Sequence, residues 1–468
     1  MKLVFKFGGT SVDGGERIKH VANLISHYSK EHRLIVVISA MGDTTDLLID
    51  LAEKAKKGRE KGVNEIFNKI EDRHLKAIDI CISRPDLKES IREKVVSLLQ
   101  ELRQVLMSII QLRELTPRSR DYILSFGERL STLLVWGALR DMGIDAEYFT
   151  GRDVGIVTDS NYGEARPLMD TTKHLVKERL EPLLMKGTIP VVTGFIGADQ
   201  DGVITTLGRG GSDYTATILG AALNVDEVWL WTDVDGLMTT DPRLVRSART
   251  LDVISFPEAM EMAIFGAKGM HPRALEPVME ANIPVRIRNT FNPNNLGTLI
   301  TKDARIDSKR VVKSVNLVRN IALINITGPS MVGALGTAAR IFEILARNGV
   351  NIMMISQSVS ESSISIVIRK EFLNRAVNSL EVNLLGSGLI KEVAWEDNVC
   401  AIAVIGAGMR GTPGVAARVF RAVANKGINV KMIAQGSSEL SISFVVNDSD
   451  GEEAVRALHE EFELNKGF

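Results

Sequence analysis

Short apolar runs with little alternation mark the strands predicted in the first two thirds of the chain. They lie at residues 2–7 (KLVFKF), 33–40 (RLIVVISA), 189–196 (IPVVTGFI), 225–231 (VDEVWLW) and 283–289 (IPVRIRN). A strand that is apolar on both faces is buried on both, which is typical of a parallel sheet covered by helices. The segments between the runs have helical periodicity, and the longest of them extends to about residue 140. The pattern therefore predicts an α/β architecture with a mostly parallel sheet.

The last third of the chain repeats itself. Ala338–Phe342 (AARIF) recurs as Ala416–Phe420 (AARVF), and Gly349–Ile355 recurs as Gly427–Ile433, always with an offset of 78 residues. Each copy reads as strand, helix, strand, strand and helix, completed by one more strand. Two tandem copies of a small unit usually pack together, side by side or across a dimer axis. The sequence leaves open which strands pair, and whether one copy interrupts the other.

Composition adds little to this picture but excludes several classes of function. The chain has 468 residues, of which 45% are hydrophobic and 25% charged, with a net charge of −1. Without a basic excess, nothing favours nucleic-acid binding. Cys81 and Cys400 lie too far apart for a zinc motif or a disulfide framework. No run of about 20 apolar residues suggests a membrane span, and the first apolar run is too short for a signal peptide. We expect a cytoplasmic protein with no nucleic-acid or membrane partner.

Glycine-rich turns with a nearby cation recur along the chain. They are Lys6–Gly9 (KFGG), Leu207–Asp213 (LGRGGSD) and Gly266–Lys268 (GAK). Small residues let the backbone approach an anion closely, and phosphoryl transfer depends on cations and amides placed around the phosphates. The turns together favour a phosphotransferase, although each one alone could be a plain loop with a solvated cation. A P-loop enzyme is excluded because no GxxxxGK[ST] segment is present.

One further glycine motif points to a different function. Gly406–Gly411 (GAGMRG) matches the GxGxxG pattern of dinucleotide-binding proteins. That pattern also requires an acid about twenty residues later, at the end of the next strand, to hold a ribose. Here the next strand, residues 428–433, contains Lys431 and no acid, and the first repeat has GPSMVG at the corresponding position. We therefore do not expect NAD binding.

A set of motifs stands in the same order as in the aspartate kinases, which the chain resembles over nearly its whole length. The motifs are Lys6–Ser11, Ser39–Asp46, Ser125–Glu128, Leu207–Asp213, Thr232–Gly236 and Lys268–Pro272. The tandem repeats resemble the paired ACT domains of that family. The resemblance implies an amino acid kinase fold, a three-layer α/β/α sandwich, followed by two ferredoxin-like (βαββαβ) ACT domains. The implied boundaries are 1–300 for the catalytic domain, 301–315 for a linker, and 316–396 and 397–468 for the ACT domains.

The resemblance also implies a reaction, in which ATP with Mg²⁺ phosphorylates the side-chain carboxylate of L-aspartate. This is the first step towards lysine, threonine, methionine and isoleucine. The implied catalytic residues are Lys6, Arg209 and Asp213, and the implied aspartate pocket is Ser39, Thr45, Glu128 and Arg209. A guanidinium can clamp a carboxylate, and Glu128 can pair with the substrate ammonium.

The nucleotide side is assigned in the same way. The implied residues are Lys6, Gly8, Gly9, Thr232, Asp233, Arg243 and Lys268, with the N–H groups of Gly8 and Gly9 donating to the transferred phosphoryl group. No side chain is predicted with confidence to bind a metal. Two alternatives remain for the whole chain, namely a glutamate or acetylglutamate kinase of the same fold, and a catalytically inactive amino-acid sensor.

For the repeats, the resemblance implies feedback regulation by an amino acid and assembly into a homodimer or tetramer. The implied effector residues are Asn351, Ile352, Gln357 and Asn429. Lysine-sensitive relatives can carry an acid in the strand after Gly349, where this chain has Met353. A buried lysine ammonium without a partner would be costly, so threonine is favoured over lysine. An effector-free dimerisation module is the alternative.

Overall fold

The computed structural model describes residues 1–266, 270–302, 304 and 311–466, which divide into two compact units. The first unit comprises residues 1–237 and 252–256 and the described residues from 270 to 304. The second unit comprises residues 238–251, 257–266 and 311–466. Two short stretches that precede residue 300 thus belong to the same unit as the repeats.

An eight-stranded sheet forms the centre of the first unit, in the order β3-β4-β2-β1-β7-β9-β10-β8. Its strands are β1 (Lys2–Phe7), β2 (Arg33–Ile38), β3 (Ala146–Phe149), β4 (Ile189–Thr193), β7 (Glu227–Thr232), β8 (Val253–Ser255), β9 (Val285–Asn289) and β10 (Thr298–Thr301). All neighbouring pairs are parallel except β9 with β10. Phe7 lies opposite Ile38 and Trp231, so the carboxyl ends of these strands meet at one edge. The predicted parallel sheet is confirmed.

The single strand predicted at 189–196 is wrong. The backbone leaves the sheet after β4, and β5 (Ile196–Ala198) pairs with β6 (Ile204–Thr206) as a separate hairpin. The turn passes through Phe195, whose φ is 66°. Apolar character alone could not reveal this turn, because both halves of the run are buried.

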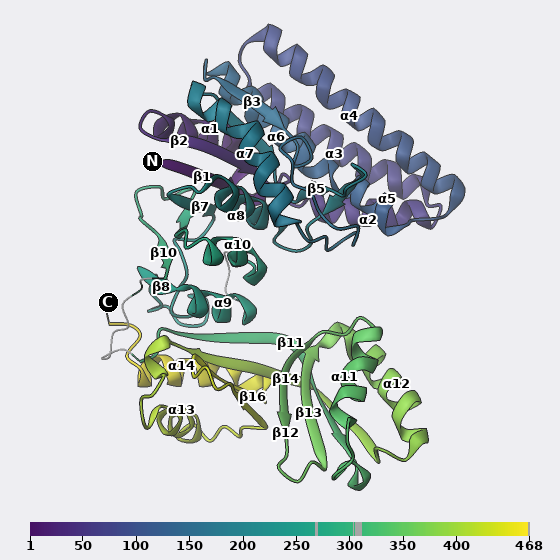
Figure 1. Cartoon of the computed structure of the whole chain (residues 1–468), viewed down its shortest axis with the longest axis vertical. Coiled ribbons are helices and arrows are strands. Elements are labelled where there is room, and N and C mark those ends of the chain that lie inside the picture. The colour runs from purple at the N-terminus through teal and green to yellow at the C-terminus, as the bar shows by residue number, and fades with distance from the viewer. Residues whose placement is uncertain (267–269, 303, 305–310, 467–468) are drawn as a thin grey trace. The chain divides into compact units, whose positions relative to one another are not determined.

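Helices cover both faces of the sheet (Figure 1). One layer contains α1 (Gly15–Ser29) and α6 (Phe126–Asp141), backed by α2 (Thr44–Lys56), α3 (Glu60–Cys81) and α4 (Pro85–Leu112). The other contains α7 (Met169–Lys186), α8 (Gly211–Leu223) and α10 (Glu276–Glu280). Strand periodicity sends Phe5 and Phe7 into the first layer, and it sends Lys6 towards α8. The three-layer sandwich agrees with the prediction.

Among the described residues, α4 is the one helix long and apolar enough to cross a membrane by length and composition. It also behaves as a core helix, because Val95, Leu99, Leu102 and Leu106 are buried in the same cluster as residues of α3 and α6. That packing accounts for one face of the helix, since 28% of its most apolar window is buried.

The second unit contains a six-stranded antiparallel sheet, in the order β12-β13-β11-β14-β16-β15. Its strands are β11 (Ser314–Thr327), β12 (Ile352–Gln357), β13 (Ser363–Arg369), β14 (Glu392–Ile405), β15 (Met432–Gln435) and β16 (Ser441–Asn447). The first repeat adds α11 (Thr337–Arg347) and α12 (Leu373–Leu384), and the second adds α13 (Val415–Ala424) and α14 (Gly451–Glu461). Figure 1 shows the two helix pairs at opposite ends of the long strands β11 and β14.

The two long strands serve both repeats. Ile321–Thr327 of β11 packs into the core of the first repeat, whereas Val312 and Val315 pack with the second. Ser314–Val318 pairs with Ala401–Ile405, and the register shifts between Val318 and Ile321. The second repeat therefore takes its last strand from residues that precede the first repeat. The boundary implied at 315/316 runs through β11.

Candidate active site

A cavity of about 720 Å³ opens at the carboxyl edge of the sheet in the first unit. Its walls come from the ends of β1 and β2, the start of α2, helices α5 (Pro117–Leu124) and α6, and the turn that leads into α8. The predicted residues that it brings together are Lys6, Gly9, Ser39, Thr45, Glu128, Arg209 and Asp213. The motifs are distant in sequence but adjacent in space because parallel strands present their carboxyl ends at one edge.

Lys6 and Asp213 form an ion pair inside this cavity. The Lys6 Nζ lies 2.5 Å from the Asp213 Oδ1, and the side chains are 12% and 10% exposed. Asp213 lies in the first turn of α8, which begins at Gly211. A Cβ at Gly211 would lie 2.6 Å from the Phe195 ring, so only glycine lets the helix start this close to the turn at Phe195. The pair places a cation beside a helix N-terminus, where an anion is favoured.

Glu128 is a buried carboxyl group with one oxygen available. Its side chain is 3% exposed, and its Oε1 accepts a hydrogen bond from the Ala40 N–H at 3.2 Å. Its Oε2 has no hydrogen-bond partner within the described part of the chain. Burial raises the pKa of Glu128 to about 8, against smaller opposing effects of the Ala40 N–H and the charge of Lys6. A buried acceptor of this kind suits a cationic ligand group.

Arg209 supplies the opposite charge. Its side chain is exposed, lines the cavity, and forms no ion pair with another residue that the structure describes. The flanking Gly208 and Gly210 have φ values of 76° and 72°, a left-handed conformation that side chains rarely adopt. The glycines therefore shape the turn that carries the guanidinium. A free guanidinium and a buried carboxyl group in one cavity fit a small zwitterion.

The predicted role of Gly8 is wrong in one respect. Its N–H donates to the Trp231 carbonyl at 3.1 Å, which extends the pairing of β1 with β7, so this N–H is not free for a phosphate. The Gly9 N–H has no such partner in the described chain and remains a candidate. Thr232 ends β7 and donates from its hydroxyl to the carboxylate of the exposed Asp233 at 3.2 Å.

The other two nucleotide predictions, Arg243 and Lys268, are not tested. Arg243 belongs to the second unit, where its Nε donates to both carboxylate oxygens of Asp241 at 3.0 Å. Lys268 lies outside the described residues. Both assignments stay predictions.

Comparison with known proteins agrees with this site. The profile of the amino acid kinase family matches residues 1–289, and that of the ACT domain matches residues 324–384 and 402–462. Aspartokinase 1, chloroplastic, of Arabidopsis thaliana is 35% identical over 476 residues, covering 98% of this chain and 80% of that protein. The chain belongs to the aspartokinase family.

Solved structures of aspartokinases match the whole fold. Escherichia coli aspartokinase III in complex with aspartate and ADP (R-state) has a TM-score of 0.85 and 32% identity, covering 98% of this chain and 99% of that one. The same protein in complex with lysine and aspartate (T-state) has a TM-score of 0.80 with the same identity and coverage. The predicted family, fold class and aspartate kinase activity are confirmed.

Sequence reasoning missed part of the aspartokinase cavity. Asp121, Thr206 and Ser212 also line it. Asp121 lies in α5 and is fully buried. Asp121 follows Arg118, Ser119 and Arg120 in a polar stretch, so nothing in the sequence set it apart.

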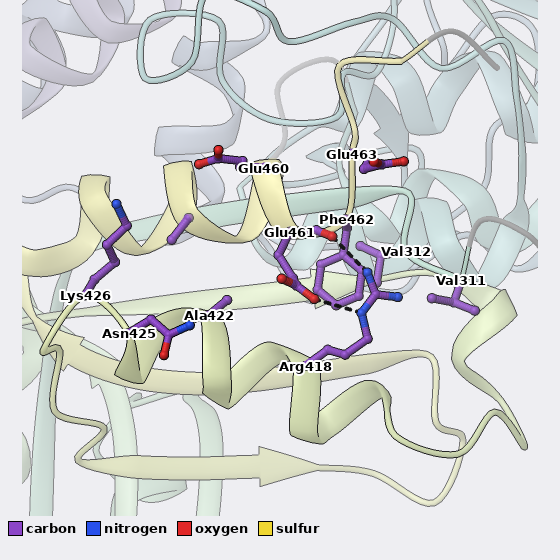
Figure 2. Close-up of a pocket in the computed structure, with 11 residues that line it drawn as sticks. Val311, Val312, Arg418, Ala422, Asn425, Lys426, Glu460, Glu461, Phe462 and Glu463 are labelled. Carbon is purple, nitrogen blue, oxygen red and sulfur yellow. Dashed lines mark hydrogen bonds and ion pairs between the residues drawn. The ribbon is translucent and has the colours of Figure 1, made fainter.

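The predicted effector residues lie on the repeats. Asn351, Gln357 and Asn429 are exposed, and Ile352 is half-buried at the start of β12. A cavity of about 540 Å³ between α13 and α14 contains none of them. Figure 2 shows the Arg418 guanidinium of that cavity directed at Glu461, to which its Nε donates at 2.9 Å. Because this cation is already paired, the cavity does not replace the predicted effector site.

Proposed function

We propose that the cavity of the first unit binds L-aspartate, whose side-chain carboxylate is phosphorylated by ATP. The observation that carries the proposal is the Oε2 of Glu128, which has no partner among the described residues and shares the cavity with the guanidinium of Arg209. Glu128 takes the ammonium of the substrate, and Arg209 clamps one of its carboxylates. The other carboxylate then faces the side of the cavity that holds Lys6.

The chemistry needs charge neutralisation more than proton transfer. The attacking group is already a carboxylate, so no general base is required. Lys6, oriented by Asp213 at 2.5 Å, stabilises the charge that develops on the transferred phosphoryl group. Lys6→Ala should therefore lower kcat more than it raises the KM for aspartate.

Mg²⁺ is the expected companion of the nucleotide. No group of three or more His, Cys, Asp or Glu side chains that could hold a metal occurs among the described residues. Mg²⁺ is usually held in proteins by one or two carboxylates together with substrate phosphates and water. Asp213 is the cavity carboxylate beside Lys6 that could contribute. The ion would neutralise phosphate charge.

Proton release tests the role of Glu128. With a pKa near 8, Glu128 is mostly protonated at pH 7, but it must be ionised to pair with the aspartate ammonium. Aspartate binding at pH 7 should thus release up to about one proton, measured by calorimetry in buffers of different ionisation enthalpy. The release should fall as the pH approaches 9, where Glu128 is already mostly ionised. Glu128→Gln is the matched control and should release none, whereas equal heats in all buffers at pH 7 would contradict the assignment.

Substrate choice is tested by ADP formation with aspartate, glutamate and acetylglutamate. Turnover on aspartate alone is expected. Turnover on another acceptor only would favour a different amino acid kinase, and no turnover on any would favour an amino-acid sensor.

Regulation by threonine rather than lysine is the finer part of the proposal. Its support is Met353, in β12, at the position where an acid would be needed to pair with a lysine ammonium. Inhibition by threonine but not lysine is expected, and inhibition by lysine alone would refute it. Assembly through the repeats is supported by the exposed Ile355 and Ile433, which lie on the edge strands β12 and β15. Light scattering of the full chain should give a dimer or tetramer.

A further inference from the structure

Asp121 connects two loops at the wall of the cavity. Its Oδ2 accepts hydrogen bonds from the N–H groups of Thr206 at 2.7 Å and Gly163 at 2.9 Å. Its Oδ1 accepts a third from the Thr206 hydroxyl at 2.9 Å. The side chain is fully buried, and burial raises its pKa despite these three bonds. A buried carboxylate that contacts two separate loops fixes their relative position.

Both loops lead to Arg209. Thr206 ends β6 and stands three residues before Arg209, so the hydrogen bonds to Asp121 fix the base of the glycine turn. Gly163 lies against the turn itself, because a Cβ at Gly208 would lie 3.2 Å from the Gly163 carbonyl oxygen. The Ala165 N–H adds a bond to the Thr206 carbonyl at 3.0 Å. The loop around Gly163 thus packs against the turn that carries Arg209 and restricts its position.

Asp121 differs from Glu128 in what it leaves for a ligand. Both carboxylate oxygens of Asp121 accept hydrogen bonds from its own chain, whereas the Oε2 of Glu128 accepts none from the described residues. Asp121 therefore acts on the substrate through another residue. Arg209 is exposed and forms no ion pair with a described residue, so the geometry of its turn is the main restraint on where its guanidinium points.

We propose that Asp121 is a positioning residue, which sets the affinity for the acceptor substrate by holding the Arg209 turn in its binding geometry. This inference rests on the proposed binding of aspartate by Arg209. Loss of the bonds to Asp121 would let the turn adopt other conformations, and apparent affinity falls by the fraction of molecules that remain competent. The phosphoryl-transfer groups Lys6 and Asp213 are held by β1 and α8 instead.

Three variants grade the loss of these bonds. In Asp121→Asn, the amide oxygen can accept both N–H bonds and the amide NH₂ can donate to the Thr206 hydroxyl, so all three bonds can persist. Thr206→Val removes only the hydroxyl bond. Asp121→Ala removes all three. The KM for aspartate should rise about tenfold in Asp121→Ala, two- to threefold in Thr206→Val and less than twofold in Asp121→Asn.

The KM for ATP should change less than about twofold in all three variants, with kcat at saturating aspartate nearly retained. A purely structural role would instead lower the amount of active enzyme or change both KM values together, and either result would overturn the inference. The inference would also be overturned if Asp121→Asn raised the KM for aspartate as much as Asp121→Ala, since the three hydrogen bonds would then not determine affinity. If Asp121→Ala does not fold, the ranking of Asp121→Asn against Thr206→Val still decides the question.

A measurement without substrate separates this inference from the proposed function. Amide hydrogen exchange over residues 207–213 should be faster in Asp121→Ala than in wild type and unchanged in Asp121→Asn, with β1 unaffected in both. Unchanged exchange in Asp121→Ala would overturn the positioning role even in an active kinase. A wild-type protein with no turnover on aspartate but with the expected exchange pattern would instead refute the proposed substrate.

Discussion

Two glutamates, one in each unit, are buried equally but used differently. Glu128 in the first unit is 3% exposed, and Glu258 in the second is 1% exposed. Glu258 binds the Lys313 ammonium through Oε2 at 2.9 Å and the Ala407 N–H through Oε1 at 2.7 Å. Glu128 has one N–H donor and one oxygen without a partner in the described chain. Burying a carboxylate is costly unless it is paired, so the paired group acts as an anchor and the unpaired one as a binding site.

The anchor distinguishes the two repeats. Glu258 lies on α9 (Phe256–Ile264), and the N–H that it accepts belongs to the Gly406–Gly411 turn that matches a dinucleotide fingerprint. The corresponding residue of the first repeat is Pro329, which has no N–H. The first repeat therefore cannot form this contact. The two repeats are similar in sequence, but the second is held to α9 by a bond that the first cannot make.

Removing the Glu258 carboxylate should cause the largest loss of stability. Glu258→Ala leaves the Lys313 ammonium, which is 9% exposed, without its carboxylate. Breaking a buried pair in this way costs about 3–5 kcal/mol. Hydrogen exchange of amides in α9 and β14 should report the loss. In the control Glu258→Ala/Lys313→Met, which removes both charges, much of the stability should return, and a single variant within about 1 kcal/mol of wild type would contradict the comparison.

Replacing Glu128 should weaken substrate binding while leaving the protein folded. Glu128→Gln loses a charged hydrogen bond to the substrate, worth about 2–3 kcal/mol, so kcat/KM for aspartate should fall about 100-fold in initial-rate assays. Because the folded pKa of about 8 exceeds the ordinary 4.5, wild-type stability declines as pH rises through that window. The variant lacks this decline, so its relative stability should increase from pH 5 to 8 in urea unfolding. A large loss of stability at pH 9 would mean that Glu128 is an anchor too.

Replacing Ala407 with proline, the residue at the corresponding position of the first repeat, tests the contribution of the Ala407 N–H alone. Ala407→Pro removes only that donor, and the backbone should accept it, because Gly406 and Gly328 share a ψ of 131° with φ values of 172° and −179°. The expected cost is about 2 kcal/mol, the penalty for an unmade bond to a charged group, measured by exchange in β14. Pro329→Ala is the matched control and should be nearly neutral; equal effects would show that the N–H is not the distinguishing feature.

The hydrogen bond between Ser441 and Glu261 should contribute least to stability. The Ser441 hydroxyl donates to the Glu261 carboxylate at 2.9 Å at a partly exposed position. Ser441→Ala should cost about 1 kcal/mol or less, measured by the same exchange experiment, with Ser363→Ala in the first repeat as its counterpart. A loss as large as that of Glu258→Ala would place the anchor at Ser441 instead.

Much of the fold and part of the cavity could be predicted from sequence. The runs around Val4 and Ile35 are buried on both faces, which is a local signal of a parallel sheet, and Lys6 and Arg209 stand beside glycines that are visible in sequence. The fate of the Gly8 N–H could not be predicted, because its acceptor is the carbonyl of Trp231, more than 200 residues away. Asp121 was missed for the same reason, since Thr206, its main partner, is recognisable only once the strands are assembled.

The strand that serves both repeats also bears on how the chain folds during synthesis. Ser314–Val318 leaves the ribosome before the whole first repeat, yet its partner Ala401–Ile405 follows that repeat. This half of β11 must wait without a strand partner while Ile321–Thr327 can already pair with β13. The first repeat can therefore complete its strands during synthesis, whereas the second must recover a strand that was made before the first. For the same reason the second repeat could not be transferred between genes as one contiguous piece.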